Sequence, residues 1–323
     1  MWTEVPVRDS TASVAEMTMD LGAAEGRLWG SLGVQPVEHR VGLARTGITV
    51  RVTEVGEGRP TVFVHGATVA GASWADLAAS LSGVRCLLVD RPGCGRSEPL
   101  PEPGNFDAWV EAAGDLVVDV MDAFELESAS VVATSLGGFH GVRAAVLHPH
   151  RVERLVLLGW VLGTPGPQPP MWLRLASTKP MARMGVRMPA SVGSVRRLLR
   201  LAGLRRAIDE GRMGDEALEW VAALFADTDT LFNETVAAPR FTSPRAGWDH
   251  RLIHDDQTLA GMRVPTCIVY GEEDPFGTAE AARGLGRKMS DAEVHVLPEA
   301  GHAPWLDAPD EVAEIVRPFL VAD

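Results

Sequence analysis

The chain has 323 residues, 46% of them hydrophobic and 23% charged, so it can bury a substantial core and is not globally disordered. Its formal net charge of −13 excludes a general nucleic-acid binder, because such a protein neutralises phosphates with Lys and Arg. Three widely spaced cysteines exclude a disulfide framework, and without a CxxC or HExxH spacing we expect no metal and no other cofactor.

The first 20 residues lack the basic start and the apolar run of a signal peptide. No window approaches the roughly 18 uninterrupted apolar residues that a membrane-spanning helix requires. We therefore expect a cytoplasmic protein without a transmembrane segment. Residues 1–36 are interpreted as an amino-terminal extension, with an amphipathic helix around positions 24–32.

Strand and helix patterns alternate through most of the remaining chain. Residues 37–43 and 48–55 alternate apolar and polar side chains between turn signals, which predicts an antiparallel pair. Beyond them, apolar runs predict buried strands, and a 3.6-residue periodicity predicts helices. The further strands are expected at 61–65, 84–90, 129–134, 154–159, 266–270 and 293–297, and the helices at 73–81, 105–124, 136–147, 278–288 and 309–320.

This order predicts an α/β protein with a mostly parallel, twisted sheet flanked by helices, because parallel strands need crossover connections. The alternation stops at residue 160 and resumes at residue 266. The interval 160–262 has no strand-like run and carries Pro and Gly punctuation, so we expect an inserted helical cap there. The core would then comprise residues 37–159 and 263–323.

One serine separates a predicted strand from a predicted helix in the segment Ala133-Thr134-Ser135-Leu136-Gly137. So sharp a turn strains the backbone of Ser135 and requires small residues two positions away on each side, which Ala133 and Gly137 provide. The hydroxyl would project from the carboxyl edge of the sheet, beside the free N–H groups at the start of the helix. This position suits a nucleophile that needs an oxyanion stabilised nearby.

The segment resembles the G-x-S-x-G elbow of the α/β-hydrolase family, with Ala133 in place of the first glycine. The likeness covers about residues 37–159 and 264–322. His65-Gly66-Ala67 resembles the family's oxyanion loop, and by that resemblance the backbone N–H groups of Ala67 and Leu136 form the oxyanion hole. Residues 90–97 resemble the family's D-x-P-G-x-G-x-S segment, which is a structural loop.

Two later loops carry the family's remaining motifs. Gly271-Glu272-Glu273-Asp274 resembles its G-x-x-D loop and Gly301-His302 its G-H loop, so the resemblance implies Asp274 as the acid and His302 as the base. The order Ser, Asp, His is the one that this fold uses. In such a triad His302 takes the proton of Ser135, while Asp274 orients the imidazole and stabilises its cation.

Structural explanations compete with these assignments. Ser135 taken alone could be a helix N-cap, and Glu272 or Glu273 could replace Asp274 as the acid. Other residues with reactive side chains are expected to be structural, in the core, at helix ends or on the surface. These are His65, Cys86, Cys94, His140, His148, His150, Cys267 and Asp307.

The expected cap contains nine basic residues and no acidic residue between Met171 and Arg206. Apolar residues alternate with them, which favours an amphipathic helix with a solvated basic face. The alternative is attraction to an anionic partner, such as a membrane surface, an acidic carrier domain or a carboxylated substrate. The basic residues are Arg174, Lys179, Arg183, Arg187, Arg196, Arg197, Arg200, Arg205 and Arg206.

The resemblance implies a cofactor-independent serine hydrolase. We expect an apolar small-molecule substrate, a carboxylic ester or lactone, which is bound under the cap and cleaved through an acyl-Ser135 intermediate. A C–C bond hydrolase, a biosynthetic cyclase or lyase, and a non-catalytic small-molecule receptor are the alternatives, because one fold hosts many functions. Accumulation of an acyl-enzyme would separate hydrolysis by this route from the cyclase and receptor alternatives.

Overall fold

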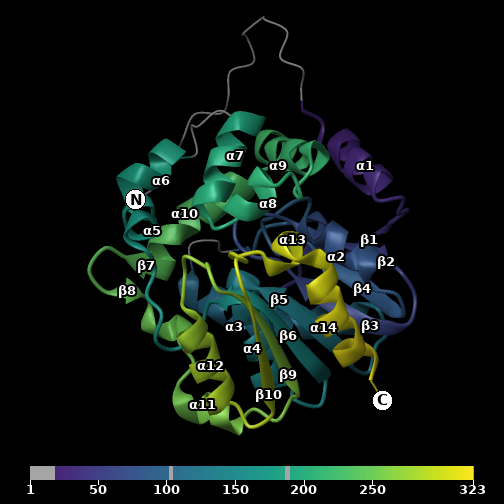
Figure 1. The fold of residues 1–323 in the computed structure, drawn as a ribbon, viewed down its shortest axis with the longest axis vertical. Helices are drawn as coiled ribbons and strands as arrows, with labels where there is room; N and C mark the ends of the chain where they lie inside the picture. The colour runs from purple at the N-terminus through teal and green to yellow at the C-terminus, as the bar shows by residue number, and fades with distance from the viewer. Residues whose placement is uncertain (1–18, 102–104, 186–189, 323) are drawn as a thin grey trace, which may run out of the picture.

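The computed structural model describes residues 19–101, 105–185 and 190–322, and they form a central sheet with helices on both faces and further helices above one end (Figure 1). The sheet has eight strands in the order β1-β2-β4-β3-β5-β6-β9-β10. Their bounds are β1 (Val37–Gly42), β2 (Thr49–Val55), β3 (Arg59–Val64), β4 (Val84–Val89), β5 (Ala129–Thr134), β6 (Val152–Val161), β9 (Thr266–Gly271) and β10 (Ala292–Leu297).

The direction of the strands confirms the predicted mostly parallel sheet. β2 runs antiparallel to both β1 and β4, whereas β4, β3, β5, β6, β9 and β10 all run parallel to one another. The carboxyl ends of the parallel strands therefore meet at one edge, where ligands bind in open α/β sheets. Short loops beyond β3, β5, β9 and β10 lead to the predicted site residues.

Helices cover both faces of the sheet, because alternate residues of the buried strands are apolar on both sides. On β5, Val132 belongs to one buried apolar layer, while Val131 and Ala133 belong to the other. The first layer includes α2 (Ala75–Ser80) and α14 (Pro309–Val321), and the second includes α3 (Phe106–Ala123), α4 (Ser135–Leu147) and α12 (Ala279–Lys288). Among the shorter elements are the 3₁₀ turns η1 (Gly71–Trp74) and η2 (His250–Leu252), and helix α13 (Pro304–Asp307).

The amino-terminal helix is part of the folded body. Helix α1 (Leu21–Ser31) begins after the N-cap Asp20 and buries one apolar stripe. Its Glu25 forms a buried ion pair with Arg51 of β2, and the Leu21 N–H donates to Asp227 at 3.1 Å. The helix thus contacts both the sheet and the helices above it, whereas residues 1–18 lie outside the described part of the chain.

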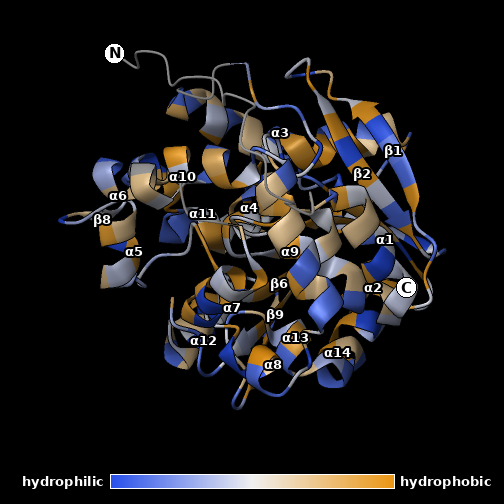
Figure 2. Ribbon diagram, turned by 90° about the horizontal axis from the view of Figure 1, so that it is seen from above, coloured by the Kyte–Doolittle hydropathy of each residue, from blue (hydrophilic) through white to orange (hydrophobic). Residues whose placement is uncertain are grey.

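The interval predicted to be a cap is mainly helical. Figure 1 shows α5–α10 above the sheet, with α11 lower down beside α12, where Lys288 pairs with Asp256. In Figure 2, α7 carries both blue and orange segments, as an amphipathic helix does. The helices are α5 (Met171–Ala176), α6 (Lys179–Gly185), α7 (Val192–Leu201), α8 (Arg205–Asp209), α9 (Asp215–Asp227), α10 (Thr230–Phe241) and α11 (Asp256–Gly261).

Two expectations for the secondary structure and one for a histidine were wrong. The interval does contain strands, a two-stranded ribbon of β7 (Thr242–Ser243) and β8 (Gly247–Trp248), which is too short to leave an alternation pattern. β6 continues past residue 159 to Val161. His140, expected at a helix end or on the surface, is buried within α4, where its Nδ1–H donates to the Ala113 carbonyl at 3.0 Å.

None of the described helices is long and apolar enough to cross a membrane.

Candidate active site

Ser135 lies on the sharp turn between β5 and α4, with a positive φ of 50°. This left-handed conformation is strained for a non-glycine residue and persists only where close packing enforces it. A Cβ on Gly137 would lie 2.2 Å from the Val64 carbonyl oxygen, so only glycine fits there. Ala133 carries a methyl group that the family's glycine lacks. This methyl group fits because it faces Gly141, and a Cβ added to Gly141 would lie only 3.1 Å from the Ala133 Cβ.

The loop after β3 carries the predicted oxyanion donor Ala67. His65 is fully buried, its Nδ1 lies 2.8 Å from the Gly66 carbonyl oxygen, and its Nε2 accepts the Arg91 N–H at 3.0 Å. Burial and the neighbouring Arg91 hold the pKa of His65 well below its usual value, so the imidazole is neutral with its proton on Nδ1. His65 therefore fixes the loop backbone, which is the structural role predicted for it.

A buried ion pair braces the same loop from above. The Arg91 guanidinium donates to the His65 and Gly66 carbonyls at 3.0 and 2.9 Å and pairs with Glu234 of α10 at 3.1 Å. Glu234 also accepts the N–H of Thr68 at 3.3 Å. The loop is thus held on both sides of Ala67, and one of the supports comes from the helices above the sheet.

Asp274 and His302 meet at the carboxyl edge of the sheet. The His302 Nδ1–H donates to Asp274 Oδ2 at 2.8 Å, and Asp274 also accepts backbone N–H groups from Trp160 and Phe276 at 2.8 and 2.9 Å. Hydrogen bonds of this kind fix the orientation of a carboxylate. The competing acids Glu272 and Glu273 are exposed to solvent, and the hydrogen bond to His302 is made by Asp274.

The loop of His302 is tied to the helices above the sheet. The His302 N–H donates to the carbonyl of Gly203, between α7 and α8, at 3.1 Å. The fully buried Asp307 accepts the Gly301 N–H at 2.7 Å and the Ala207 N–H of α8 at 2.8 Å. Burial raises the pKa of Asp307, and its hydrogen bonds are all within the fold, as expected of a structural residue.

Ser135 and His302 line a single cavity of about 490 Å³, together with Ala67 and Leu136. Leu136 is the second residue of α4, so its N–H has no acceptor four residues earlier within the helix. The arrangement places a hydroxyl, an imidazole paired with a carboxylate, and two backbone donors around one space. Such a set is chemically suited to acyl transfer.

The rest of the cavity wall is predominantly apolar. Between them α1, α5–α7, α9 and α10 supply Leu, Val, Met, Trp and Phe side chains, and the Phe276 ring lies tilted against the His302 ring with 4.4 Å between the ring centres. Among the described lining residues there is no Lys and no Arg, and the acidic side chains are Asp76 and Glu234. An apolar, uncharged ligand fits this wall best.

Sequence reasoning missed four residues that hold the site in place. Gly203 and Glu234 belong to the helices above the sheet, and Trp160 acts through its backbone alone, so none of the three carries a motif. Arg91 did leave a signal, because it lies within the Gly-rich segment 90–97 that was interpreted as a structural loop.

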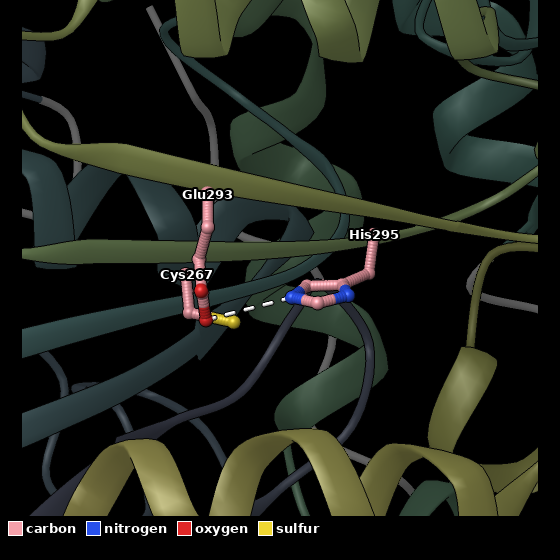
Figure 3. A group of neighbouring side chains, drawn as sticks. All are labelled: Cys267, Glu293 and His295. Atoms are coloured by element: carbon pink, nitrogen blue, oxygen red, sulfur yellow. Dashed lines mark ion pairs between the residues drawn. The ribbon is translucent and has the colours of Figure 1, made fainter. Parts of the chain in front are cut away.

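The three cysteines are buried and unpaired. Burial and the nearby Glu234 raise the pKa of Cys94 well above its usual value, which makes a thiolate nucleophile unfavourable there, as expected. Cys267 was predicted to be a small core residue and is buried. It also lies beside Glu293 and His295, away from the cavity, and these three side chains are the one group of prospective metal ligands within the described residues (Figure 3).

The predicted basic segment proves to be amphipathic and largely paired within the fold. In α7, Val195 and Leu199 are buried, while Arg196 and Arg200 point outward and pair with Asp215 and Asp209. Arg205 and Arg206 also have acidic partners. Position 187 and the side chain of Arg183 lie outside the described part of the chain.

Several curated proteins are similar to this chain over most of its length. A 2-hydroxymuconate semialdehyde hydrolase of Pseudomonas sp. is 29% identical over 279 residues, which is 85% of this chain and 91% of the relative. A 2-hydroxy-6-oxo-2,4-heptadienoate hydrolase of Pseudomonas putida is 28% identical over 281 residues, covering 86% of this chain and 94% of the relative.

Solved structures share the fold. The naproxen esterase of Bacillus subtilis superposes with a TM-score of 0.71 at 18% identity, covering 95% of this chain and 99% of its own. A meta-cleavage product hydrolase of Pseudomonas fluorescens superposes with a TM-score of 0.68 at 24% identity, covering 87% of this chain and 96% of its own. The alpha/beta hydrolase family matches residues 61–315, which is most of the chain. With the strand order and the serine elbow described above, this match shows that the chain belongs to the alpha/beta hydrolase family.

Proposed function

We propose that the protein is a serine hydrolase that transfers an acyl group from a large, apolar, uncharged substrate to Ser135 and then to water. The observation that carries this proposal is the cavity, in which Ser135 and His302 open into an apolar wall without a described Lys or Arg. An anionic substrate would have to bury its charge there without a cationic partner, which is costly.

The geometry supports a division of roles among the site residues. His302 would take the Ser135 proton as the hydroxyl attacks the carbonyl carbon, and Asp274 would stabilise the imidazolium through their 2.8 Å hydrogen bond. The N–H groups of Ala67 and Leu136 would bind the oxyanion, each contributing about 10²–10³ in rate. His302 would then protonate the leaving group and later activate the water that releases the acyl group.

The names of the relatives bear on which bond is cleaved. A 2-hydroxy-6-oxo-dienoate, the substrate in the names of several relatives, contains no ester, so its hydrolysis must break a C–C bond next to a ketone. These relatives favour the C–C bond alternative over the ester or lactone reading. Both reactions form an acyl-serine and differ in the leaving group, which is a stabilised carbanion in one case and an alkoxide in the other.

The cavity wall supports a substrate without the carboxylate that the relatives' named substrates carry. Dienoates carry a carboxylate, whereas the described wall offers no Lys or Arg to bind one, and its acidic side chains, Asp76 and Glu234, are not partners for an anion. Asp76 lies in the first turn of α2, and burial raises the pKa of its carboxyl group. We therefore favour a neutral ketone or ester over a carboxylated ring-fission product.

Labelling with a fluorophosphonate probe is the decisive first experiment, with the adduct located by mass spectrometry and Ser135→Ala as control. We expect an adduct on Ser135 that the variant lacks. The substrate class is then tested with apolar p-nitrophenyl esters against a 2-hydroxy-6-oxo-dienoate and its methyl ester. Turnover of only the free dienoate would refute the uncharged substrate, and failure of well-folded protein to label would favour the receptor or cyclase alternative.

A further inference from the structure

Strands β9 and β10 bring three side chains with metal-binding atoms together at the edge of the sheet (Figure 3). Cys267 of β9 is directly opposite Glu293 of β10 in the parallel register, and His295 follows two residues later on the same face of β10. The Cys267 Sγ, a Glu293 carboxylate oxygen and a His295 ring nitrogen all lie within 4.8 Å of one another. None of the three lines the cavity.

These separations are close to those of a tetrahedral zinc site. Bonds of about 2.0–2.3 Å at a tetrahedral angle place neighbouring ligand atoms roughly 3.3–3.7 Å apart. The Nε2 atom of His295 lies 3.5 Å from Glu293 Oε1, and no pair in the group exceeds 4.8 Å. Side-chain movements of about 1 Å would therefore complete the geometry.

The polar atoms of the three side chains face one another. His295 Nε2 is shielded from solvent, has no hydrogen-bond partner among the described residues, and forms its ion pair with Glu293 of the same group at 3.5 Å. Such a buried polar atom costs free energy unless it binds something. Cys267 is buried, whereas Glu293 is exposed, so an ion could enter from the Glu293 side and keep a water molecule as a fourth ligand.

We propose that Cys267, Glu293 and His295 bind a divalent transition-metal ion of the zinc type. A thiolate with an imidazole selects such ions over Mg²⁺ and Ca²⁺, which prefer oxygen ligands throughout. Binding requires Cys267 to release its thiol proton to solvent and His295 to be neutral. No short sequence motif announces this site, because its ligands are on two strands joined through α12.

The ion would act as a brace between the two strands that position the acid and the base. Asp274 follows the end of β9 at Gly271 by three residues, and His302 follows the end of β10 at Leu297 by five. A metal ion that binds only the folded chain stabilises it, by an amount that grows with the logarithm of the ion concentration once this exceeds Kd. The expected consequence is a higher midpoint of urea unfolding when zinc is present.

The test uses the full chain, free of any affinity tag and treated with EDTA. Co²⁺ is titrated and followed by absorption, because a cobalt–thiolate bond gives a charge-transfer band, and Zn²⁺ binding is followed by calorimetry. The ligand variants are Cys267→Ser, Glu293→Gln and His295→Gln. The matched controls are Cys86→Ser, another buried strand thiol, and His39→Gln, a half-buried strand histidine that pairs with Glu54.

We expect one ion per chain, a cobalt–thiolate band that Cys267→Ser abolishes, and zinc affinity at least about tenfold weaker in Glu293→Gln and His295→Gln. Both controls should bind as the wild type does. A wild-type protein without the band would overturn the proposal, as would zinc affinity that is unchanged in Glu293→Gln and His295→Gln. These two variants alter partly exposed side chains, so they decide the matter even where Cys267→Ser fails to fold.

Discussion

Replacing Glu234 by Gln tests whether helix α10 holds the oxyanion loop in position. The carboxylate pairs with the guanidinium of Arg91, of which only 1% is exposed, and accepts the Thr68 N–H at 3.3 Å. Gln preserves the shape and one acceptor oxygen but removes the charge. Thr68 is the residue after Ala67. If the hydrogen bond from Thr68 to position 234 shifts, the N–H of Ala67, the proposed oxyanion donor, is displaced with it.

The magnitude follows from the burial of the pair. Leaving a buried charge wholly unpaired costs about 3–5 kcal/mol, and a hydrogen bond to a charged group contributes about 1.5–3 kcal/mol. Because Gln keeps one acceptor, we expect Glu234→Gln to lower the free energy of unfolding by roughly 2–3 kcal/mol. Loss of one oxyanion donor costs about 10²–10³ in rate, so a displaced donor should reduce kcat by at least about tenfold with little change in KM.

Urea unfolding measures the stability, and the rate of fluorophosphonate labelling reports on the oxyanion hole without knowledge of the substrate. The control is Glu280→Gln, because the Glu280–Arg287 pair is 72% and 64% exposed and should contribute little to the free energy of unfolding. A variant that loses stability yet labels at the wild-type rate would show that Glu234 is only structural. An unchanged free energy of unfolding would contradict the buried ion pair between Glu234 and Arg91.

Three further predictions concern the contacts of the cap, a buried histidine and the basic helix. Gly203→Ala places a Cβ 2.9 Å from the Cβ of His302 at a φ of 94°, so kcat should fall by about tenfold or more while urea unfolding shows a loss of about 1–3 kcal/mol. Burial lowers the pKa of His140 from 6.5 to about 3, so only the unfolded chain gains this proton as the pH falls from 6.5 towards 3. Stability should therefore decline by up to about 1.4 kcal/mol per pH unit over that range, and His140→Gln should flatten the decline in urea midpoints measured at pH 7 and 5. Arg196 and Arg200 pair with acidic residues of the fold, so charge reversal of Arg196, Arg197 and Arg200 should leave co-sedimentation with anionic vesicles unchanged, whereas weaker sedimentation would favour the anionic-partner alternative.

Local sequence patterns were sufficient to predict the elements of the core and the loops that carry the site. Apolar runs indicate buried strands, and a 3.6-residue period of apolar residues indicates helices. Both patterns are local, so they can be recognised without knowing which other elements pack against them. β5 spans Ala129–Thr134, the predicted bounds, and α14 spans Pro309–Val321 against a prediction of 309–320. The turns and loops that follow β5, β9 and β10 carry Ser135, Asp274 and His302, which the resemblance to the family's motifs made the candidate site residues.

Contacts between distant segments were decided only by the tertiary structure. Glu234 is 143 residues from Arg91, and Gly203 lies 99 residues before His302 in the chain, so no local period reveals either contact. His140 has the polarity of a surface residue but is buried, because α3 covers the face of α4 that carries it. The cluster of Cys267, Glu293 and His295 likewise exists only through the register of β9 and β10. A sequence records the period of each element, whereas the pairing of elements depends on how their apolar faces pack together, and that packing determines which polar groups meet.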